Sequence, residues 1–489
     1  MVAASAFSFV QLACASASST TATVTNQPGA PRWTVRLLPG GDVDVGGIEV
    51  RLCFNGAAPA HVGPEYAAAA VYLMDMPVAI DGDDRVLGPL PVDDRGIDTR
   101  RLPAGACVAF VVDVEAAATA FDSQAVAEVV GRSLLLSPDV WLWRPQPWPD
   151  GVDGGTLVVE KDDHLDLAVP FASDRDGTYL VSASTFALQS WSAVGRFRSR
   201  TTVVKRRDTT LTVSWLDDAA EGIDAVTLTS WLEVAIDDVA AVSGAFPVER
   251  VRVLVVPRPG TRPVLSGFLG RGGGVSAVLH VATGPLQHDD RLDEDGRWVL
   301  THELAHALLP PVRRGDAWLN EGLTTWQQEM LPVLAKRRPL GVATDQLAIG
   351  LHTGLQRARG DQLSLERACT EMDERHSYQH CYWGGAALAA LLATDVGDAG
   401  VFALIRALGK AAAFDANPQP ATALLQAVSS SSSDPLARRA AAALLGLWQQ
   451  HKNAPFPADD NAVDGYVWPA DPEPVIDNEA AAVPPAVVE

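Results

Sequence analysis

The chain has 489 residues, 47% apolar and 20% charged, which is the composition of a folded globular protein rather than a disordered one. A single hydrophobic core rarely serves so long a chain, so we expect two or three domains. The net charge of −22 argues against nucleic acid and anionic membranes as partners, because both require clustered lysine and arginine. No apolar run reaches the roughly 20 residues of a membrane-spanning helix, so we expect no such segment.

Residues 1–32 are predicted to form a leader. Residues 1–31 contain no charged side chain, and AFSFVQLACASA is a short apolar run followed by small residues, as in a signal peptide. The lysine or arginine that usually opens a signal peptide is missing, and the residues before Cys14 match a lipoprotein cleavage site poorly. We expect export to the periplasm, the medium or a lipid-anchored position, and leave a cytoplasmic location open.

Cysteine usage also bears on the compartment. Cys14 lies in the leader, and removing it leaves two cysteines in the N-terminal half and two late in the chain. The pairs Cys53–Cys107 and Cys369–Cys381 would suit an oxidising compartment. Four buried free thiols are the alternative, since cysteine is commonly buried in cytosolic proteins.

Residues 33–220 are predicted to form an all-β, sandwich-like domain. Short strand-like runs are separated by Gly, Pro and Asp clusters such as LPGGD and PDGVDGG. The predicted strands are WTVRLL, IEVRLCF, AAVYLM, CVAFVVDV, GTLVVE, LDLAVPF, TYLVSAS and TTLTVSW. We expect the tryptophan-rich segment 140–151 to pack against the core, with a carbohydrate or peptide platform as the alternative.

The pattern changes at residue 221, and residues 221–452 are predicted to form a second, mostly helical domain. Its first helix is followed by the strands RVRVLVV and VSAVLHV, with the Gly-rich stretch GFLGRGGG between them. That stretch lacks the Lys-Ser/Thr of a phosphate-binding loop and leads into a strand, so we expect a mobile loop beside a cleft. Ser430–Ser433 are expected in a surface loop, and the acidic, proline-rich residues 453–489 in a disordered tail.

The motif that carries chemistry is HELAH, residues 302–306. On a helix, His302 and His306 project from one face one turn apart, so both imidazoles can reach one metal ion. Glu303 lies next to that face, where its carboxylate can take a proton from metal-bound water. Pro310 and Pro311 are expected to end the helix. Because such a motif also arises by chance, it needs a second element to support it.

The stretch WLNEG supplies that element. Asp316 is expected to cap a helix AWLNEGLTTWQQEML, which places Glu321 in its first turns. Two helices joined by a short connection can pack antiparallel and complete a His-His-Glu set for one zinc ion, leaving a position for water. Thr325, one turn beyond Glu321, could hydrogen-bond a ligand. The alternative for Glu321 is a carboxylate at a helix start that favours the helix dipole.

HELAH followed by WLNEGL resembles the gluzincin metallopeptidases, in particular the aminopeptidase N and glycyl aminopeptidase groups. The resemblance implies that His302, His306 and Glu321 bind zinc and that Glu303 is the general base. It also implies a fold of the α+β class with several domains. In that fold a thermolysin-like, mostly helical zinc peptidase domain follows an N-terminal all-β domain.

The stretch YQHCYWGGAALAALLATD is a third point of similarity. The family has a tyrosine at the head of a Gly-containing helix here, and its hydroxyl stabilises the tetrahedral oxyanion. By motif this tyrosine is Tyr382, with Tyr378 one turn earlier as the reserve. The alternative for Tyr382 is an aromatic ring packed beside Trp383.

The late cysteines have one further reading. Cys369, His376, His380 and Cys381 combine a His-x-x-x-His spacing with two thiols and could form a structural zinc site. Because the spacing is irregular, we favour a disulfide that steadies the loop holding Tyr382.

The sequence departs from the family's pattern in two places. The gap from His306 to Glu321 is four residues shorter than in aminopeptidase N, so the cleft wall must differ. The Gly-x-Met-Glu-Asn stretch that grips the substrate's free amino group is absent, and GFLGRGGGVSAVLHV stands in its place. We expect VSAVLHV to be the edge strand that pairs with a substrate backbone.

We therefore predict zinc-dependent hydrolysis of a peptide or protein substrate. Two alternatives remain: a non-catalytic cell-surface or periplasmic binding protein on the same scaffold, or a zinc hydrolase of a non-peptide amide or epoxide. The missing amine-binding stretch and the large β domain motivate the first alternative. The substrate, exo- or endo-cleavage and the oligomeric state do not follow from the sequence.

Overall fold

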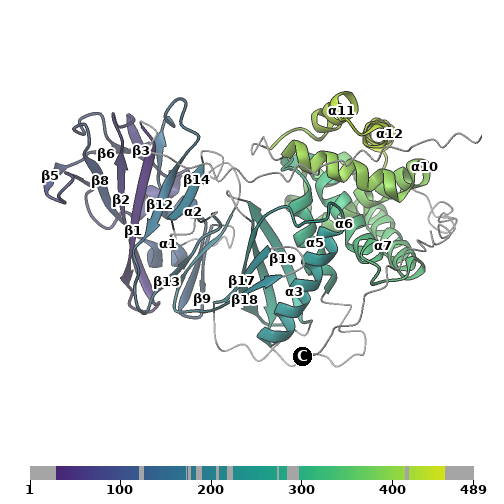
Figure 1. Ribbon diagram of the computed structural model, residues 1–489, viewed down its shortest axis with the longest axis horizontal. Coiled ribbons are helices and arrows are strands. Elements are labelled where there is room, and N and C mark those ends of the chain that lie inside the picture. Colours follow the sequence, from purple (N-terminus) through teal and green to yellow (C-terminus); the bar gives the residue numbers. More distant parts are fainter. Residues whose placement is uncertain are drawn as a thin grey trace, which may run out of the picture.

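A computed structural model describes residues 29–65, 67–120, 126–171, 173, 178–182, 190–204, 209–216, 224–260, 262–271, 275–283, 297–412 and 418–457. A β lobe formed by the first part of the chain lies beside a mixed lobe whose far side is helical (Figure 1). The predicted α+β, multidomain architecture, with a β domain ahead of a mostly helical one, is confirmed. Of the predicted leader, residues 1–28 lie outside the described residues, and Pro31 and Arg32 already belong to the first strand.

The β lobe contains three sheets. Their strand orders are β14-β12-β1-β2-β8-β4-β5, β13-β15-β10-β9 and β11-β3-β7-β6. The strands are β1 (Pro31–Pro39), β2 (Val45–Phe54), β3 (His61–Gly63), β4 (Val78–Ile80), β5 (Val86–Pro89), β6 (Val92–Asp93), β7 (Gly96–Asp98), β8 (Cys107–Asp113), β9 (Ala127–Val130), β10 (Ser133–Leu136), β11 (Arg144–Gln146), β12 (Gly154–Val159), β13 (Asp166–Ala168), β14 (Thr178–Ser182) and β15 (Ser192–Gly195). Short helical segments interrupt them: η1 (Ala67–Tyr72), α1 (Val114–Ala120) and α2 (Pro138–Trp141).

The predicted strand AAVYLM is wrong, because the chain forms the 3-10 helix η1 there. Its run of alanines favours helical over extended backbone.

The tryptophan-rich segment packs into the core of the β lobe, as expected. Trp141 and Trp143 are fully buried. The indole N–H of Trp141 donates to Ser192 Oγ at 3.0 Å, and that of Trp33 donates to the carbonyl of Trp143 at 2.9 Å. Buried indoles with satisfied N–H groups hold a core together rather than offer a ligand platform.

Of the alternatives that the sequence left open for the four cysteines, the structure has the two disulfides. Cys53 and Cys107 face each other on the paired strands β2 and β8. Cys369 on α8 (Leu365–Thr370) is bonded to Cys381 on α10 (Tyr378–Ala412). The second bond removes both thiols from the alternative zinc site that included His376 and His380, so that site is excluded.

The mixed lobe contains a five-stranded sheet in the order β16-β17-β18-β20-β19. Its strands are β16 (Arg198–Val204), β17 (Thr209–Trp215), β18 (Arg250–Arg258), β19 (Val264–Arg271) and β20 (Val275–Ala282). β17 pairs in parallel with β18, so β16 and β17 belong to this lobe. The boundary expected at residue 221 is wrong and lies before Arg198, because a strand pattern does not reveal which sheet the strand joins.

The edge of this sheet also differs from our expectation. VSAVLHV forms β20, which lies between β18 and β19 and is buried along almost its whole length. Such a continuous apolar run is typical of an interior strand. The edge strand is instead β19, which includes Gly267–Arg271 from the stretch we expected to be a loop; residues 272–274 of that stretch lie outside the described residues.

Helices cover the sheet and form the rest of the lobe (Figure 1). They are α3 (Ala225–Ala240), α5 (Arg297–Ala305), η3 (His306–Leu308), η4 (Arg314–Asp316), α6 (Ala317–Leu334), α7 (Leu340–Asp361), α8, α9 (Met372–Arg375), α10, α11 (Ala421–Ser431) and α12 (Pro435–His451). α10 bends at Gly397, whose φ of 71° interrupts the helix.

Two expectations near the C-terminus are corrected. Ser430 and Ser431 complete α11 instead of lying in a loop, because their hydroxyls bond the carbonyls of Gln426 and Ala427 one turn back. The expected tail begins too early, since Phe456 is 7% exposed and belongs to the core of the mixed lobe. Residues 458–489 lie outside the described residues.

The helix α10 overturns the expectation that no segment could span a membrane. Tyr378–Lys410 is a 33-residue span whose apolar window has a mean hydropathy of 1.7. It is long and apolar enough to cross a bilayer. The expectation rested on the lack of an uninterrupted apolar run, whereas a spanning helix tolerates a few charged residues. In the fold, 61% of this window is buried, as is usual for the core helix of a folded domain.

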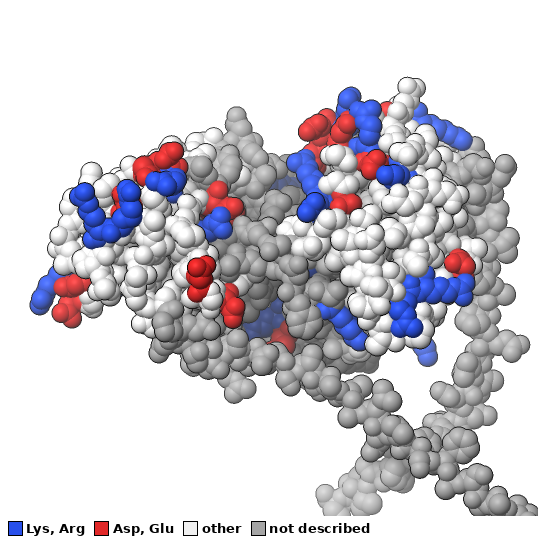
Figure 2. All heavy atoms as spheres, turned by 90° about the horizontal axis from the view of Figure 1, so that it is seen from above, with Lys and Arg blue, Asp and Glu red and all other residues white. Residues whose placement is uncertain are grey.

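The two lobes share a small hydrophobic cluster. Leu135 and Ala193 from the β lobe pack with Leu254, Val256 and Val278 from the five-stranded sheet. On the face drawn in Figure 2, acidic and basic side chains are interspersed over both lobes. The described part of this face therefore carries no large area of a single charge.

Candidate metal centre

The helix α5 carries the HELAH motif into the interior of the mixed lobe. Val299, Leu300 and Leu304 are buried and anchor the helix against its neighbours. His302 is 5% exposed and Glu303 is 9% exposed. α5 ends at Ala305, so His306 lies in the following 3-10 turn, ahead of the two prolines. Burial of charged groups is costly unless they have partners, which makes their surroundings informative.

The second helix, α6, brings Glu321 to the histidines. Gly322 lies against Gly385 of α10 so closely that an added Cβ would be 2.4 Å from its Cα. This approach and the buried Trp318 fix the first turns of α6. Asp316 precedes the helix as expected, but its side chain makes no capping hydrogen bond, because 3-10 turn η4 leads directly into the helix.

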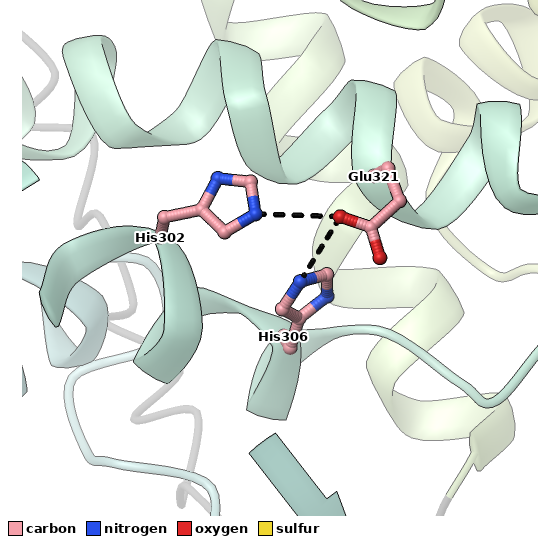
Figure 3. Close-up of side chains that lie close together, drawn as sticks. All are labelled: His302, His306 and Glu321. Atoms are coloured by element: carbon pink, nitrogen blue, oxygen red, sulfur yellow. Dashed lines mark hydrogen bonds and ion pairs between the residues drawn. The ribbon is translucent and has the colours of Figure 1, made fainter. Parts of the chain in front are cut away.

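Three side chains converge on one point (Figure 3). Oε2 of Glu321 lies 3.3 Å from Nε2 of His302 and 3.4 Å from Nε2 of His306. The candidate ligand atoms of the three residues all lie within 4.8 Å of one another. Zinc bonds of about 2.0–2.1 Å in a tetrahedron would set neighbouring ligand atoms about 3.3 Å apart. The donor set and its spacing therefore fit one zinc ion.

The outer nitrogens of the imidazoles are held by neighbouring side chains. Nδ1 of His302 lies 2.9 Å from Oε1 of Gln328. Nδ1 of His306 lies 3.1 Å from Oδ1 of Asn320 and 3.2 Å from the Thr324 hydroxyl. An amide oxygen is an acceptor, so each Nδ1 can donate its proton to it, which would leave each Nε2 available to a metal ion at the shared point.

One predicted supporting residue is corrected. We expected Thr325 to hydrogen-bond a ligand, but Thr324 does so, and Thr325 Oγ1 has no hydrogen-bond partner among the described residues. A shift of one position turns a helical side chain by about 100°, so the spacing rule selected the wrong threonine. Sequence reasoning also missed Asn320 and Gln328; the Asn of the WLNEG motif was a signal for the first.

The two carboxylates have opposite pKa shifts. Burial raises the pKa of Glu303 to about 7 and Glu321 adds to the rise, while His302 and the backbone N–H of Leu269 oppose it. Burial alone would raise the pKa of Glu321 too, but the imidazoles of His306 and His302 hold it well below its usual range. Glu321 is thus suited to stay ionised as a ligand, and Glu303 to exchange a proton near neutral pH.

The two candidate tyrosines have different surroundings. The ring of Tyr382 stacks on His302 with centroids 5.8 Å apart, and Glu321 is one of the carboxylates near its hydroxyl. Burial and the two nearby carboxylates raise the pKa of Tyr382 well above its usual value. Tyr378 is 37% exposed, and its hydroxyl donates to Asp373 at 3.0 Å. Tyr382 lines the cavity, and Tyr378 is not among the described residues that do.

A cavity of about 270 Å³ opens over the three ligands. Its helical wall includes His302, Glu303, His306, Asn320, Glu321 and Tyr382, and its other wall includes Gly267, Phe268, Leu269 and Arg271 of β19. At Gly267 an added Cβ would lie 2.4 Å from Cγ of Glu303, so only glycine lets the strand approach this carboxylate. Sequence reasoning missed Gly267 and Arg271, because the glycines around them indicated a loop.

No protein-family model matches the chain, and no curated protein sequence matches it significantly. Solved structures do match. One is an aminopeptidase N family protein from Idiomarina loihiensis, with 12% identity and a TM-score of 0.52 over 89% of this chain and 73% of that one. Another is an M1 zinc metallopeptidase from Deinococcus radiodurans, with 16% identity and a TM-score of 0.51 over 92% of this chain and 97% of that one.

The chain has a gluzincin aminopeptidase fold. At these identities the likeness shows the fold, and the chemistry must be argued from the site. A mutant of the D. radiodurans enzyme has been solved with a Tyr-Ser-Ala substrate. Its structure matches with 15% identity and a TM-score of 0.51 over 88% of this chain and 96% of that one.

Proposed function

We propose that this protein is a zinc-dependent peptidase. The single observation that carries the proposal is the buried His302-His306-Glu321 donor set, with Glu303 beside it. The fold supports it, because proteins of similar structure are zinc metallopeptidases, one of them solved with a tripeptide substrate.

Each residue has a distinct task in this proposal. When bound, zinc supplies Lewis-acid polarisation of the scissile carbonyl and lowers the pKa of a nearby water. Glu303 accepts a proton from the attacking water at its carboxylate and later returns it to the leaving amine. The Tyr382 hydroxyl, whose proton is held firmly, donates a hydrogen bond to the oxygen on which negative charge develops.

Within the described residues, β19 is the outer strand of its sheet and pairs with β20 on one side only. A substrate in extended conformation can add to such an edge by main-chain hydrogen bonds, which orients the scissile bond. Because Gly267 of this strand packs directly against the side chain of Glu303, the strand also holds the general base in place.

The test is a comparison of the zinc-loaded wild type with Glu303→Gln on a broad peptide library, with cleavage read by mass spectrometry. We expect one zinc per chain in both proteins and cleavage by the wild type, reduced about 10²–10⁴-fold in the variant. If zinc-loaded wild type cuts no peptide, the proposal is overturned. Intact ligands bound without turnover would then favour a binding protein, and turnover of non-peptide amides or epoxides would favour another hydrolase.

We also propose that the protein works in an oxidising compartment, after export. The disulfides Cys53–Cys107 and Cys369–Cys381 support this, because such bonds rarely persist in a reducing cytosol. Fractionation of cells that make the full chain, followed by thiol labelling, tests it. Chain found only in the cytosol with free thiols would contradict export.

A further inference from the structure

Arg271 places a positive charge in the wall of the cavity over the metal centre. It is the last residue of β19 and lines the same cavity as His306 and Glu321. Its guanidinium donates to the backbone carbonyl of His306 and is only partly exposed. The side chain is therefore held beside the candidate ligands rather than extended into solvent.

This cation has no acidic partner in the described part of the chain. Its hydrogen-bond acceptor there, the carbonyl of His306, is neutral. Burial lowers the pKa of Arg271 to about 10, which leaves the side chain charged at neutral pH. A partly buried charge without a counter-charge is unfavourable, and most of the five N–H donors of a guanidinium remain available here.

The two acids in the described cavity lining are already engaged. Glu321 lies between the imidazoles of His302 and His306, and Glu303 is packed against the backbone of Gly267. Within the described lining, no third carboxylate remains to hold a substrate's α-ammonium group. The charge that is left for recognition is positive.

We propose that Arg271 binds a carboxylate of the substrate, so that this cleft selects peptides by a negative group instead of a free amino terminus. The proposal rests on the peptidase function proposed above. A planar guanidinium matches a carboxylate with two parallel hydrogen bonds, which gives direction as well as charge. The carboxylate has two sources, the C-terminus of the peptide or an acidic side chain.

The experiment measures binding rather than turnover, using zinc-loaded Glu303→Gln as an inactive host and calorimetry as the readout. Four versions of one hexapeptide series distinguish the sources: a free or amidated C-terminus, combined with Glu or Gln at an internal position scanned along the peptide. An N-acetylated copy of each tests the amino terminus. The series is repeated in hosts that also carry Arg271→Gln, Arg271→Lys or the control Arg262→Gln; Arg262 is exposed ahead of β19.

We expect removal of one carboxylate source to weaken binding by about 10- to 100-fold, with N-acetylation changing it less than threefold. Arg271→Gln should abolish the discrimination at unchanged zinc content, Arg271→Lys should retain part of it, and Arg262→Gln all of it. If carboxylate and amide peptides bind equally, if no peptide binds, or if the preference survives Arg271→Gln, the inference is overturned. If Arg271→Gln does not fold, the parent host decides alone. Tighter binding of the carboxylate peptides there supports the inference, and equal binding of carboxylate and amide peptides overturns it.

The library assay for hydrolysis is independent of this one. If zinc-loaded wild type cuts no peptide but the inactive host binds carboxylate peptides selectively, the proposed reaction is overturned and the role of Arg271 is supported. If the wild type cuts peptides but the inactive host shows no carboxylate preference, the proposed reaction is supported and the role of Arg271 is overturned.

Discussion

The helical wall of the cleft and its strand wall hold different kinds of group. The helical wall, formed by α5, η3, α6 and the start of α10, supplies the three candidate ligands, Glu303 and Tyr382. The strand wall, β19, supplies backbone hydrogen-bonding groups, a glycine and one arginine. The helical wall keeps the motif pattern of the gluzincins, whereas the strand wall does not. Metal chemistry fixes ligand geometry within tenths of an ångström, but a substrate-binding strand needs only to match the substrate it takes.

The walls meet at one side chain. Glu303 belongs to the helical wall and packs against Gly267 of the strand wall, and the nearby backbone N–H of Leu269 lowers its pKa. The proposed general base is therefore positioned by both walls. Changes in the strand can alter specificity and also disturb catalysis, and the following variants separate the two effects.

The largest effect is expected on the helical wall, at Tyr382. Removing a hydrogen-bond donor to a developing oxyanion costs about 10²–10³-fold in rate, so Tyr382→Phe should lower kcat by that factor with little change in KM. The matched control is Tyr378→Phe, whose hydroxyl contacts Asp373 on the surface. Steady-state kinetics on one cleaved peptide checks both. Equal losses in the two variants would contradict the assignment.

A second effect concerns stability and pH at the meeting point of the walls. In metal-free protein the pKa of Glu303 is raised to about 7, so the folded state holds its proton more tightly than the unfolded chain. The cost of ionising it is absent below about pH 4.5, grows as the pH rises to 7, and then stays constant. Metal-free Glu303→Gln should exceed wild type in unfolding free energy by about 3 kcal/mol at pH 8 and equal it at pH 4.

Chemical denaturation at the two pH values measures this difference, with chelator present throughout. A stability difference that does not change with pH would show that Glu303 ionises as freely as an exposed glutamate.

The third effect tests the strand wall directly. A methyl group at Gly267 would lie 2.4 Å from Cγ of Glu303, so Gly267→Ala should displace this proposed general base. A shift of about 1 Å in a catalytic group costs about 10²-fold, which we expect in kcat/KM with zinc content unchanged. Gly341→Ala is the control, because an added Cβ there meets nothing within 4 Å. Full activity of Gly267→Ala would mean that the strand does not constrain Glu303.

The smallest effect separates two adjacent threonines of α6. Thr324→Val removes the hydroxyl that contacts Nδ1 of His306, and loss of such a supporting bond typically weakens metal binding by about tenfold or more. Thr325→Val removes a buried hydroxyl that has no partner in the described part of the chain, so the zinc Kd should not change. Competition titration against a zinc chelator gives both constants. The opposite order would restore Thr325 as the supporting residue.

The contrast between the walls also explains what could be predicted. HELAH and WLNEG are local patterns: the first puts His302 and His306 one turn apart, and the second puts Glu321 in the first turns of the next helix. Together with the resemblance to the gluzincins, they allowed the convergence of the three residues to be predicted. β19 could not be predicted that way, because its glycines favour a loop and its extended form depends on pairing with β20. The domain boundary was misplaced for the same reason: β16 and β17 reveal their sheet only through β18.

The finer details of the site were beyond sequence rules for a different reason. Which threonine supports His306 depends on a rotation of about 100° between adjacent helical positions. The role of Arg271 depends on the absence of a carboxylate partner among the described residues, which is a tertiary property.

The most direct test of the account is a crystal structure of the zinc-loaded protein with anomalous data at the zinc edge. The account predicts a single ion bonded to Nε2 of His302, Nε2 of His306 and a carboxylate oxygen of Glu321, each at about 2.0–2.2 Å. An ion held elsewhere, or a Glu321 carboxylate more than about 5 Å from the ion, would contradict it.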